Sequence, residues 1–505
     1  MPAPDAIKAL GAMATRAIFL LLSAALLLTG CGRSDDGALA IAFIDSPEGL
    51  FASDLPLSPG AQHVRAATQA GLVVFNAQGD VIPGLADRWI VTDDGLSFIF
   101  RLREGTWPDG TELTAESVRG ALASRMRQLR GTPLALDLAP IEDVRAMAGR
   151  VIEIRLSSPV STLLQLLAQP ELALSKGEGG TGDMLLVQEG RSAILALKPP
   201  SQRGLPEEED WQDNVRPIHL HAAGAEAAIG WFYEGRLDLV LGGRIGAWPL
   251  ADTGPLSRGT VRIDPALGLF GLQVRRADGL LADALGREAV AMAIDRPTLI
   301  APFNIGGWVP TTRIVAPNLP GDRGFIRERW ADLTIEQRRE VAARRVAAWR
   351  AANEGAEARL TVALGEKPGE SRGLDMLYVQ LADQLASIGI SLERAQDEAE
   401  ADLVLVDTVA RYAAPVWFLN QFHCSLRRGL CNEEVDLLVE QIAGIANTDA
   451  RAALSAEAEA RLTVANIYIP FGQPLRWSLV RSGIDGFAAN QWAFHPLPPL
   501  AQLAR

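Results

Sequence analysis

Hydrophobic and polar positions alternate most regularly in the segment 81–118. The alternation at Leu96–Arg103 predicts a β-strand, and a shorter strand that contains a tryptophan is predicted at Arg88–Val91. Asp93-Asp94-Gly95 predicts the turn between these strands, and Pro108-Asp109-Gly110 predicts a second turn after them. The segment therefore reads as a hairpin that leads into a further element.

That further element is a helix capped by Thr114. Thr114 and Ser117 only approximate a capping box, because the acidic Glu116 comes one position early. The same patterns predict further strands at 38–44, 151–156, 184–187 and 359–364, and a helix at 162–168. The chain thus mixes strands and helices throughout, which is typical of an α/β protein.

The N-terminus has the pattern of an exported protein. The apolar run Ala17–Leu28 follows basic residues and is too short to span a bilayer, as in a signal peptide. It ends in Leu28-Thr29-Gly30-Cys31, which resembles the lipobox of bacterial lipoproteins. We expect residues 1–30 to be a lipoprotein signal peptide, Cys31 to be lipidated, and 31–37 to form a tether. The alternative is a short anchor helix with a chance cysteine.

Length and charge narrow the class of protein. A chain of 505 residues is too long for a single core, so at least two lobes are expected. The formal net charge of −13 argues against nucleic acid as a partner. The acidic run 207–210 predicts a solvated loop.

The run from Val81 to Val118 resembles the signature of the family 5 extracellular solute-binding proteins, the dipeptide- and oligopeptide-binding components of ABC importers. Ser117 is the visible departure, since the family usually has Asp there. Further along, Arg287–Arg296 is similar to a buried helix of the family, and Leu374–Ile390 to a long one. Residues 433–440 continue the resemblance, which extends over most of the chain in the expected order.

The resemblance implies a two-lobed α/β fold, the Venus-flytrap periplasmic-binding-protein fold of type II (cluster C). Lobe one would combine 38–265 with 470–505 and contain an extra peripheral subdomain at 65–164. Lobe two would be 266–469. The chain would cross twice between the lobes, near 265 and 470, and form a hinge. Ligand would bind in the cleft between the lobes and stabilise the closed state.

The three cysteines agree with export. Lipidation of Cys31 leaves Cys424 and Cys431, seven positions apart, in an oxidising compartment where such a loop closes easily as a disulfide. The dipeptide-binding branch of the family carries a similar local bridge just after its ligand-contacting loop. Two free thiols are the alternative, and a metal site is less favoured because no second pair exists.

The segment 407–424 supplies the main candidates for ligand contact. Where peptide-binding relatives have an Asp that pairs with the free α-amine of the peptide, this chain has Arg411. A guanidinium favours a carboxylate or phosphate. We therefore hypothesise that the solute is not anchored as a free α-amine and presents an anion to Arg411, unless Arg411 instead pairs with an acidic neighbour such as Asp407. The candidate contacts of this segment are Arg411, Tyr412, Trp417 and Asn420, of which the two aromatic residues could stack on the solute.

Two other places border the expected cleft. Asp45 and Ser46 stand where the first strand turns toward it, although a turn-stabilising role fits them equally well. The run 177–182 satisfies G-x-G-x-x-G, but a strand-like run follows it, so a dinucleotide site is not supported. It resembles a family turn at the cleft, which implies backbone contacts from Thr181 and Gly182.

Two alternatives from other classes remain. Ser371 lies in a G-x-S-x-G run between a predicted strand and helix, and Asp407 with His423 or His495 follows in hydrolase order. A lipid-anchored serine esterase is therefore the enzymatic alternative, although no HGGG-like oxyanion segment is present. A lipoprotein that senses its ligand without transport is the other alternative.

The histidines do not change this interpretation. His219 and His221 lie on one side of a predicted strand and could begin a metal site, and some family members carry nickel or haem, but no third ligand is near. We therefore expect no cofactor and no catalysis. The expected protein is a periplasmic, lipid-anchored monomer that delivers a peptide, a peptide-like or a small anionic solute to an ABC permease and ATPase complex.

Overall fold

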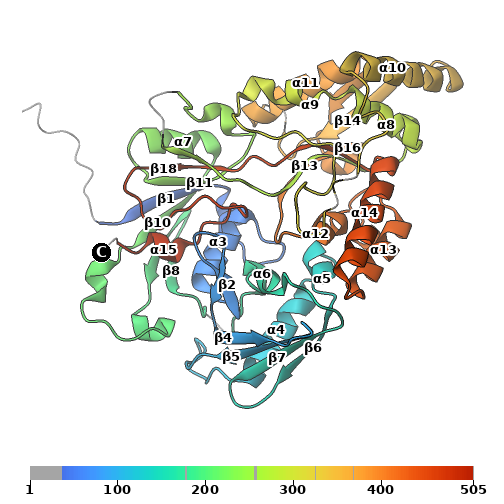
Figure 1. Cartoon of the computed structure of the whole chain (residues 1–505). Helices are drawn as coiled ribbons and strands as arrows, with labels where there is room; N and C mark the ends of the chain where they lie inside the picture. Colours follow the sequence, from blue (N-terminus) through green and yellow to red (C-terminus); the bar gives the residue numbers. More distant parts are fainter. Residues whose placement is uncertain are drawn as a thin grey trace, which may run out of the picture. The chain divides into compact units, whose positions relative to one another are not determined.

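Two large β-sheets organise the chain, and a smaller sheet lies in a peripheral subdomain (Figure 1). The computed structural model describes residues 37–176, 179–254, 259–322, 324, 326–367 and 369–503. The expected signal peptide, Cys31 and all but the last residue of the tether lie outside these residues. No helix within the described ranges is long and apolar enough to cross a membrane. Contacts group Leu39–Arg505 into one unit.

The first large sheet has seven strands and is built around β1 (Leu39–Ile44). β1 pairs in parallel with β10 and with β11, and its first five residues are buried. A continuous apolar run is what a strand covered on both faces requires. The strand order is β12 (Val261–Ile263), β18 (Trp477–Val480), β11 (Leu239–Gly243), β1, β10 (Ile218–Ala223), β9 (Ser192–Leu197) and β8 (Met184–Glu189).

The second large sheet has five strands around β13 (Gly268–Val274), all of whose residues are buried. Its order is β15 (Ile390–Arg394), β14 (Ala358–Ala363), β16 (Leu403–Val409), β13 and β17 (Tyr468–Gly472). Its helices include α8 (Ala284–Ala293), α9 (Arg296–Ile300), α10 (Ile335–Ala352) and α11 (Arg372–Ala386). The buried helix expected near residue 290 is confirmed by α8. The helix expected at 374–390 was wrong at its end, because Gly389 turns with a φ of +85° and Ile390 begins β15.

The chain passes between the two sheets twice, at 264–267 and at 473–476. The two passages lie side by side, since the amide of Asp264 donates to the carbonyl of Arg476 at 3.0 Å. The second passage directly follows β17, which belongs to the second sheet and ends at Gly472.

The peripheral subdomain holds a four-stranded sheet with α4 (Ala115–Gln128) beside it (Figure 1). Its order is β4 (Ala86–Val91), β5 (Ser97–Leu102), β7 (Val151–Leu156) and β6 (Ile141–Ala146). The predicted hairpin is therefore confirmed. The capping box is complete rather than approximate: Thr114 Oγ1 accepts from the Ser117 amide at 3.2 Å, and Ser117 Oγ accepts from the Thr114 amide at 3.1 Å. The Ser117 hydroxyl thus does what a longer acidic side chain does elsewhere.

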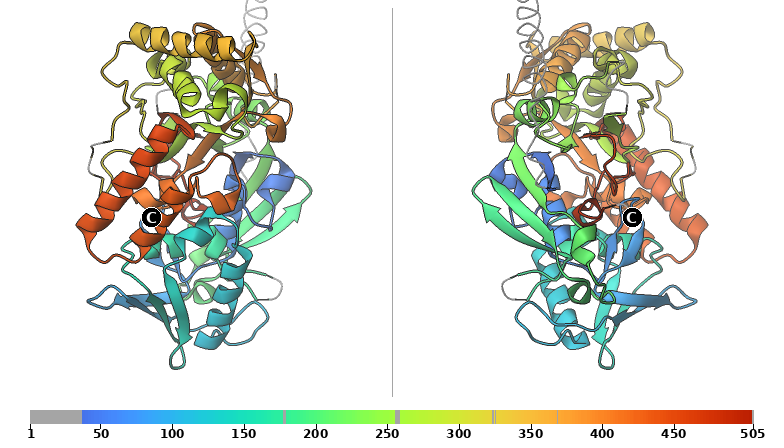
Figure 2. Two further views of the ribbon diagram at one scale, coloured as in Figure 1. Left: turned by 90° about the vertical axis from the view of Figure 1, so that its right-hand side faces the viewer. Right: turned by 90° about the vertical axis from the view of Figure 1, so that its left-hand side faces the viewer.

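Further elements complete the framework. In the first lobe and the subdomain these are α2 (Pro47–Leu50), α3 (Pro59–Thr68), β2 (Val73–Phe75), β3 (Val81–Pro83), α5 (Pro133–Asp137), α6 (Leu163–Leu167), α7 (Ala225–Tyr233) and α15 (Leu497–Leu500). In the second lobe they are α12 (Pro415–Asn420), α13 (Glu433–Ala443) and α14 (Thr448–Ala465), of which the last two lie side by side (Figure 2).

Candidate functional site

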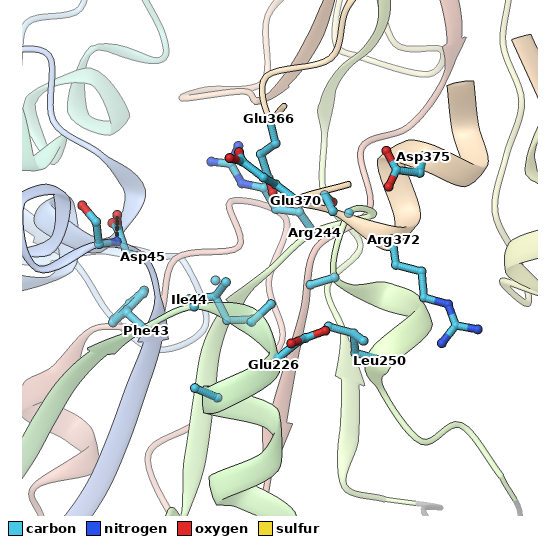
Figure 3. A pocket seen from close by; sticks show the side chains of 18 of the residues that line it. Phe43, Ile44, Asp45, Glu226, Arg244, Leu250, Glu366, Glu370, Arg372 and Asp375 are labelled. Carbon is cyan, nitrogen blue, oxygen red and sulfur yellow. Dashed lines mark hydrogen bonds between the residues drawn. The ribbon is translucent and has the colours of Figure 1, made fainter. Parts of the chain in front are cut away.

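A cavity of about 1410 Å³ lies between the two large sheets (Figure 3). We call it the outer cavity. It is lined by segments that follow β1 and β11 of the first sheet and β14 of the second, together with the start of α7 and of α11. Open α/β sheets bind ligands at the carboxyl ends of their strands, so this position is the expected one for a solute.

The charges of the outer cavity are predominantly negative. Burial raises the pKa of Glu366, and the nearby guanidinium of Arg244 opposes that effect. Figure 3 shows the side chains of Glu366, Glu370 and Arg244 gathered in one part of the cavity. The acidic residues of its lining are Asp45, Glu48, Glu226, Glu366, Glu370 and Asp375. The basic residues are Arg191, Arg244 and Arg372.

Asp45 and Ser46 line the outer cavity, and both side chains also hold the turn after β1. Asp45 accepts from the Ser46 amide at 2.7 Å and from the Ser58 hydroxyl at 2.8 Å. Ser46 Oγ caps α2 by accepting from the amide of Gly49 at 2.9 Å. The turn-stabilising role is therefore present, and contact with a solute stays a prediction for both residues.

A smaller inner cavity of about 140 Å³ continues from the outer one. The two share the wall residues Phe43, Pro59, Gly242 and Arg244. The inner cavity extends along β16 and the second passage between the sheets, and Arg411 is among its lining residues. The cleft between the lobes thus has a wide acidic part and a narrow part that contains the candidate guanidinium.

Arg411 forms a two-pronged ion pair with Glu171, which lies 240 positions earlier in the chain. Its Nη1 donates to Glu171 Oε2 at 2.8 Å, and its Nη2 donates to Glu171 Oε1 at 2.6 Å. Gln169 bonds to both the side chain and the backbone of the same arginine. Its Oε1 accepts from Nη1 of Arg411 at 3.2 Å, and its Nε2 donates to the Arg411 carbonyl at 2.9 Å. Burial would lower the pKa of Arg411, but the Glu171 carboxylate more than offsets this and raises it.

The alternative in which Arg411 pairs with an acidic residue is therefore realised in this structure, with Glu171 as the partner in place of Asp407, the neighbour named as an example. Asp407 instead accepts from Nη1 of Arg476 at 2.7 Å, at the second passage between the sheets. Arg476 also donates to the backbone carbonyl of Asp407 at 3.0 Å. Both side chains of this pair are nearly buried, so each charge is balanced by the other.

Tyr412 and Asn420 converge on Asp137 of the peripheral subdomain. The Tyr412 hydroxyl donates to Asp137 Oδ1 at 2.9 Å, and Asn420 Nδ2 donates to the same oxygen at 2.8 Å. The other oxygen, Oδ2, has no partner within the described chain, and burial raises the pKa of Asp137 to about 7. Trp417 is buried in the core beside this cluster. These three candidates line neither the outer nor the inner cavity, and their contact with a solute stays a prediction.

Thr181 and Gly182 pack closely against the residues at the end of α3. Thr181 Oγ1 accepts from the Ala70 amide at 3.0 Å and donates to the Leu174 carbonyl at 2.8 Å. A Cβ on Gly182 would come within 2.5 Å of the Gln69 amide nitrogen, so only glycine fits there. Packing accounts for both residues in this structure, and their contact with a solute stays a prediction.

The disulfide between Cys424 and Cys431 is present, with Cα atoms 5.2 Å apart. The esterase alternative needs Asp407 and a histidine beside Ser371, but these residues interact with others. Asp407 pairs with Arg476, His423 accepts from the Ser425 amide, and His495 faces Asp264. Ser371 itself lines the outer cavity at the start of α11.

The pair His219 and His221 lies on β10, as predicted, and the ring of His221 meets Trp231 edge-on. Within the described ranges no group of three His, Cys, Asp or Glu residues could hold a metal ion.

Reasoning from sequence missed several residues of the cleft. Glu171 and Gln169 hold Arg411, and Arg244 lines both cavities. The guanidinium of Arg244 makes no hydrogen bond or ion pair with any residue that the structure describes. Only its position directly after the buried strand β11 could have indicated Arg244, because polar residues there reach the edge of the sheet.

Comparison with known proteins places these observations in a family. The family described as "Bacterial extracellular solute-binding proteins, family 5 Middle" matches residues 80–427. The periplasmic oligopeptide-binding protein of Salmonella typhimurium is 21% identical over 481 residues, which covers 83% of this chain and 84% of that protein. The probable deoxycholate-binding periplasmic protein of Escherichia coli is 26% identical over 285 residues, covering 50% of this chain and 52% of that protein.

The fold has a matching solved structure. The oligopeptide-binding protein of Haemophilus influenzae, in complex with the peptide RPPGFSPFR, superposes with a TM-score of 0.79. The alignment covers 93% of this chain and 100% of that one, at 16% sequence identity. The two-lobed periplasmic-binding-protein fold is therefore confirmed, and these relatives are binding proteins rather than enzymes.

Proposed function

Because the chain belongs to the family 5 bacterial extracellular solute-binding proteins, we propose that it binds a peptide, a peptide-like compound or a small anionic solute between its lobes and delivers it to an ABC importer. The observation that carries this proposal is the outer cavity of about 1410 Å³ between the lobes, with the inner cavity behind it. Its size suits a ligand larger than most drug-sized molecules.

The proposed mechanism is closure of the cleft around the solute. The two passages at 264–267 and 473–476 are short and adjacent, as a hinge requires. Solute shifts the population toward the closed state only by the difference between its affinities for the closed and the open state. Residues from both lobes, such as Gln169 and Arg411, line the inner cavity and contribute to that difference.

Arg411, which lines the inner cavity, is the main guide to the chemical nature of the solute. Its guanidinium is positively charged and does not attract an ammonium group. We therefore propose that the solute is not held through a free α-amine at this position. One relative is named as a binder of oligopeptides and another as a probable binder of deoxycholate, so the proposal covers both peptides and non-peptide solutes.

The proposed partners rest on the family, and the proposed location rests on the family and on the expected signal peptide. We propose that the protein acts in the periplasm, that Cys31 anchors it to a membrane through lipid, and that a permease and ATPase complex accepts the solute. Loss of membrane association in Cys31→Ser, with unchanged solute binding, would support the anchor. Unchanged membrane association of that variant would contradict it.

A thermal-shift screen of the purified protein tests the binding function. The probes are free-amine peptides, N-acetylated peptides and dicarboxylates, and any solute that binds only the folded state raises the melting temperature. We expect N-acetylated or dicarboxylate probes to stabilise the protein, and Arg411→Ala to abolish this. Arg344→Ala, at an exposed arginine of α10, is the matched control and should change nothing. A rise in melting temperature with free-amine peptides that persists in Arg411→Ala would overturn the proposal that Arg411 binds an anionic group of the solute.

A further inference from the structure

A third cavity of about 400 Å³ lies beside the inner one. We call it the side cavity. It is enclosed by α3, by the hairpin of β2 and β3, by residues 168–173, by residues 203–205 and by the C-terminal segment 494–502. All of these belong to the lobe that carries the seven-stranded sheet, so the side cavity does not depend on closure of the two lobes. Its volume lies within the range of pockets that hold small ligands or single large side chains.

Most of the wall of the side cavity is apolar. Ala70, Ala168, Ala173 and Phe494 line it and are buried. At the rim that faces solvent, Ile82 and Leu205 remain 38% and 50% exposed. An apolar pocket with an apolar rim favours an apolar occupant, because each apolar surface removed from water stabilises the bound state.

The charged residues of the wall do not require a polar ligand. Arg103 already donates to the backbone carbonyl of Arg203 and, at 3.4 Å, to that of Thr181. Burial raises the pKa of Asp183, and the nearby Arg103 opposes this, so the two side chains balance each other within the wall. The hydrogen bonds and charges of Arg103 and Asp183, two of the four charged residues of the wall, are thus largely satisfied by the protein.

The side cavity meets the inner cavity at four residues. Phe75, Gln169, Pro170 and Phe494 line both. Gln169 is also the residue that holds Arg411 from two sides. A solute seated at Arg411 is therefore separated from the side cavity by the thickness of these side chains only.

We infer that the side cavity is a second subsite of the solute-binding cleft and that it receives an apolar side chain or acyl group of the bound solute. The inference rests on the proposed function, since it requires a solute in the inner cavity. It adds that this solute carries an apolar group next to the part that faces Arg411. The wall that the side cavity shares with the inner cavity favours the solute over an unrelated molecule entering from the rim.

The test compares N-acetylated dipeptides of the form acetyl-Gly-X, in which X is Gly, Ala, Leu or Phe, by isothermal titration calorimetry. Burying a leucine or phenylalanine side chain should tighten binding by about ten- to a hundredfold over glycine. Ala66→Trp, on the face of α3 that lines the cavity, should fill the space and reduce this ratio to less than about threefold. Acetyl-Gly-Gly should bind the variant as it binds the wild type.

Two further variants make the result decisive. Val74→Trp fills the same cavity from β2, in case the substitution on α3 impairs folding. Ala348→Trp, at an exposed position of α10, is the matched control and should leave every affinity unchanged. Both filling variants should lose the preference for large side chains while the control keeps it.

The outcomes separate the two proposals. If none of the dipeptides binds the wild type and no other probe of the thermal-shift screen does, the proposed function fails. If the dipeptides bind but affinity does not depend on X, or if the filling variants keep the wild-type preference, the side cavity is not a subsite and the proposed function stands.

Discussion

Asp137 provides the sharpest test of how the peripheral subdomain and the second lobe hold together. Its carboxyl group is buried, has one oxygen without a partner in the described chain, and carries a pKa of about 7 against an ordinary value of 3.8. The substitution Asp137→Asn keeps the acceptor for Tyr412 and Asn420 and removes the ionisation. The variant should therefore be favoured over the wild type as the pH rises.

The direction and the size of this pH effect follow from the linkage between proton binding and folding. The folded state binds the Asp137 proton more tightly than the unfolded state, so stability is fully present below the ordinary pKa and is lost as the pH rises through about 7. A difference of about three pKa units corresponds to roughly 4 kcal/mol in total. Between pH 5 and pH 8 the wild type should lose roughly 2–3 kcal/mol through this one group. Asp137→Asn should lose none of it.

Urea unfolding of both proteins at pH 5, 6, 7 and 8 measures this effect. The quantity of interest is the free energy of unfolding of the variant minus that of the wild type, because constant effects of the amide and titration of other groups cancel in its pH dependence. It should rise by roughly 2–3 kcal/mol from pH 5 to pH 8. Asp143→Asn, at an acid on β6 whose pKa is lowered by Arg145, should give a flat line. A flat line for Asp137→Asn as well would refute the reasoning.

Three other predictions concern stability, each measured by urea unfolding at pH 7. Thr114→Ala should cost about 1 kcal/mol because α4 loses its cap, and a change of only a few tenths would contradict the capping role. Asp407→Ala should cost about 3–5 kcal/mol because Arg476 is left nearly buried without its counter-charge, and a cost below 1 kcal/mol would show that water replaces the carboxylate. Replacing Cys424 and Cys431 together by serine should cost about 2.5 kcal/mol, from the entropy of a short closed loop, and should abolish the effect of a reductant. Equal stability of this double variant and the oxidised protein would contradict the expected contribution of loop entropy.

Much of the secondary structure could be predicted from the chain alone because its signals are local. The buried strand β1, the hairpin of β4 and β5 and the helix after Thr114 follow from side-chain periodicity and turn residues that lie within a few positions of one another. The family assignment rests on the same kind of local run and was confirmed by the match at residues 80–427. Errors appeared where a local pattern has two outcomes, as at Ile390, which continues an apolar helix pattern and in fact begins a strand.

The cleft shows the limit of such reasoning. Sequence placed a guanidinium at Arg411 but could not identify its partner, because Glu171 is 240 positions away and many acidic residues are equally plausible from the sequence alone. For the same reason the convergence of Tyr412 and Asn420 on Asp137 was not foreseen. Periodicity and turn chemistry are properties of neighbouring residues, so the sequence by itself determined the elements and the family. Ion pairs, shared cavities and buried acids depend on distances between segments, and only the tertiary structure decided those.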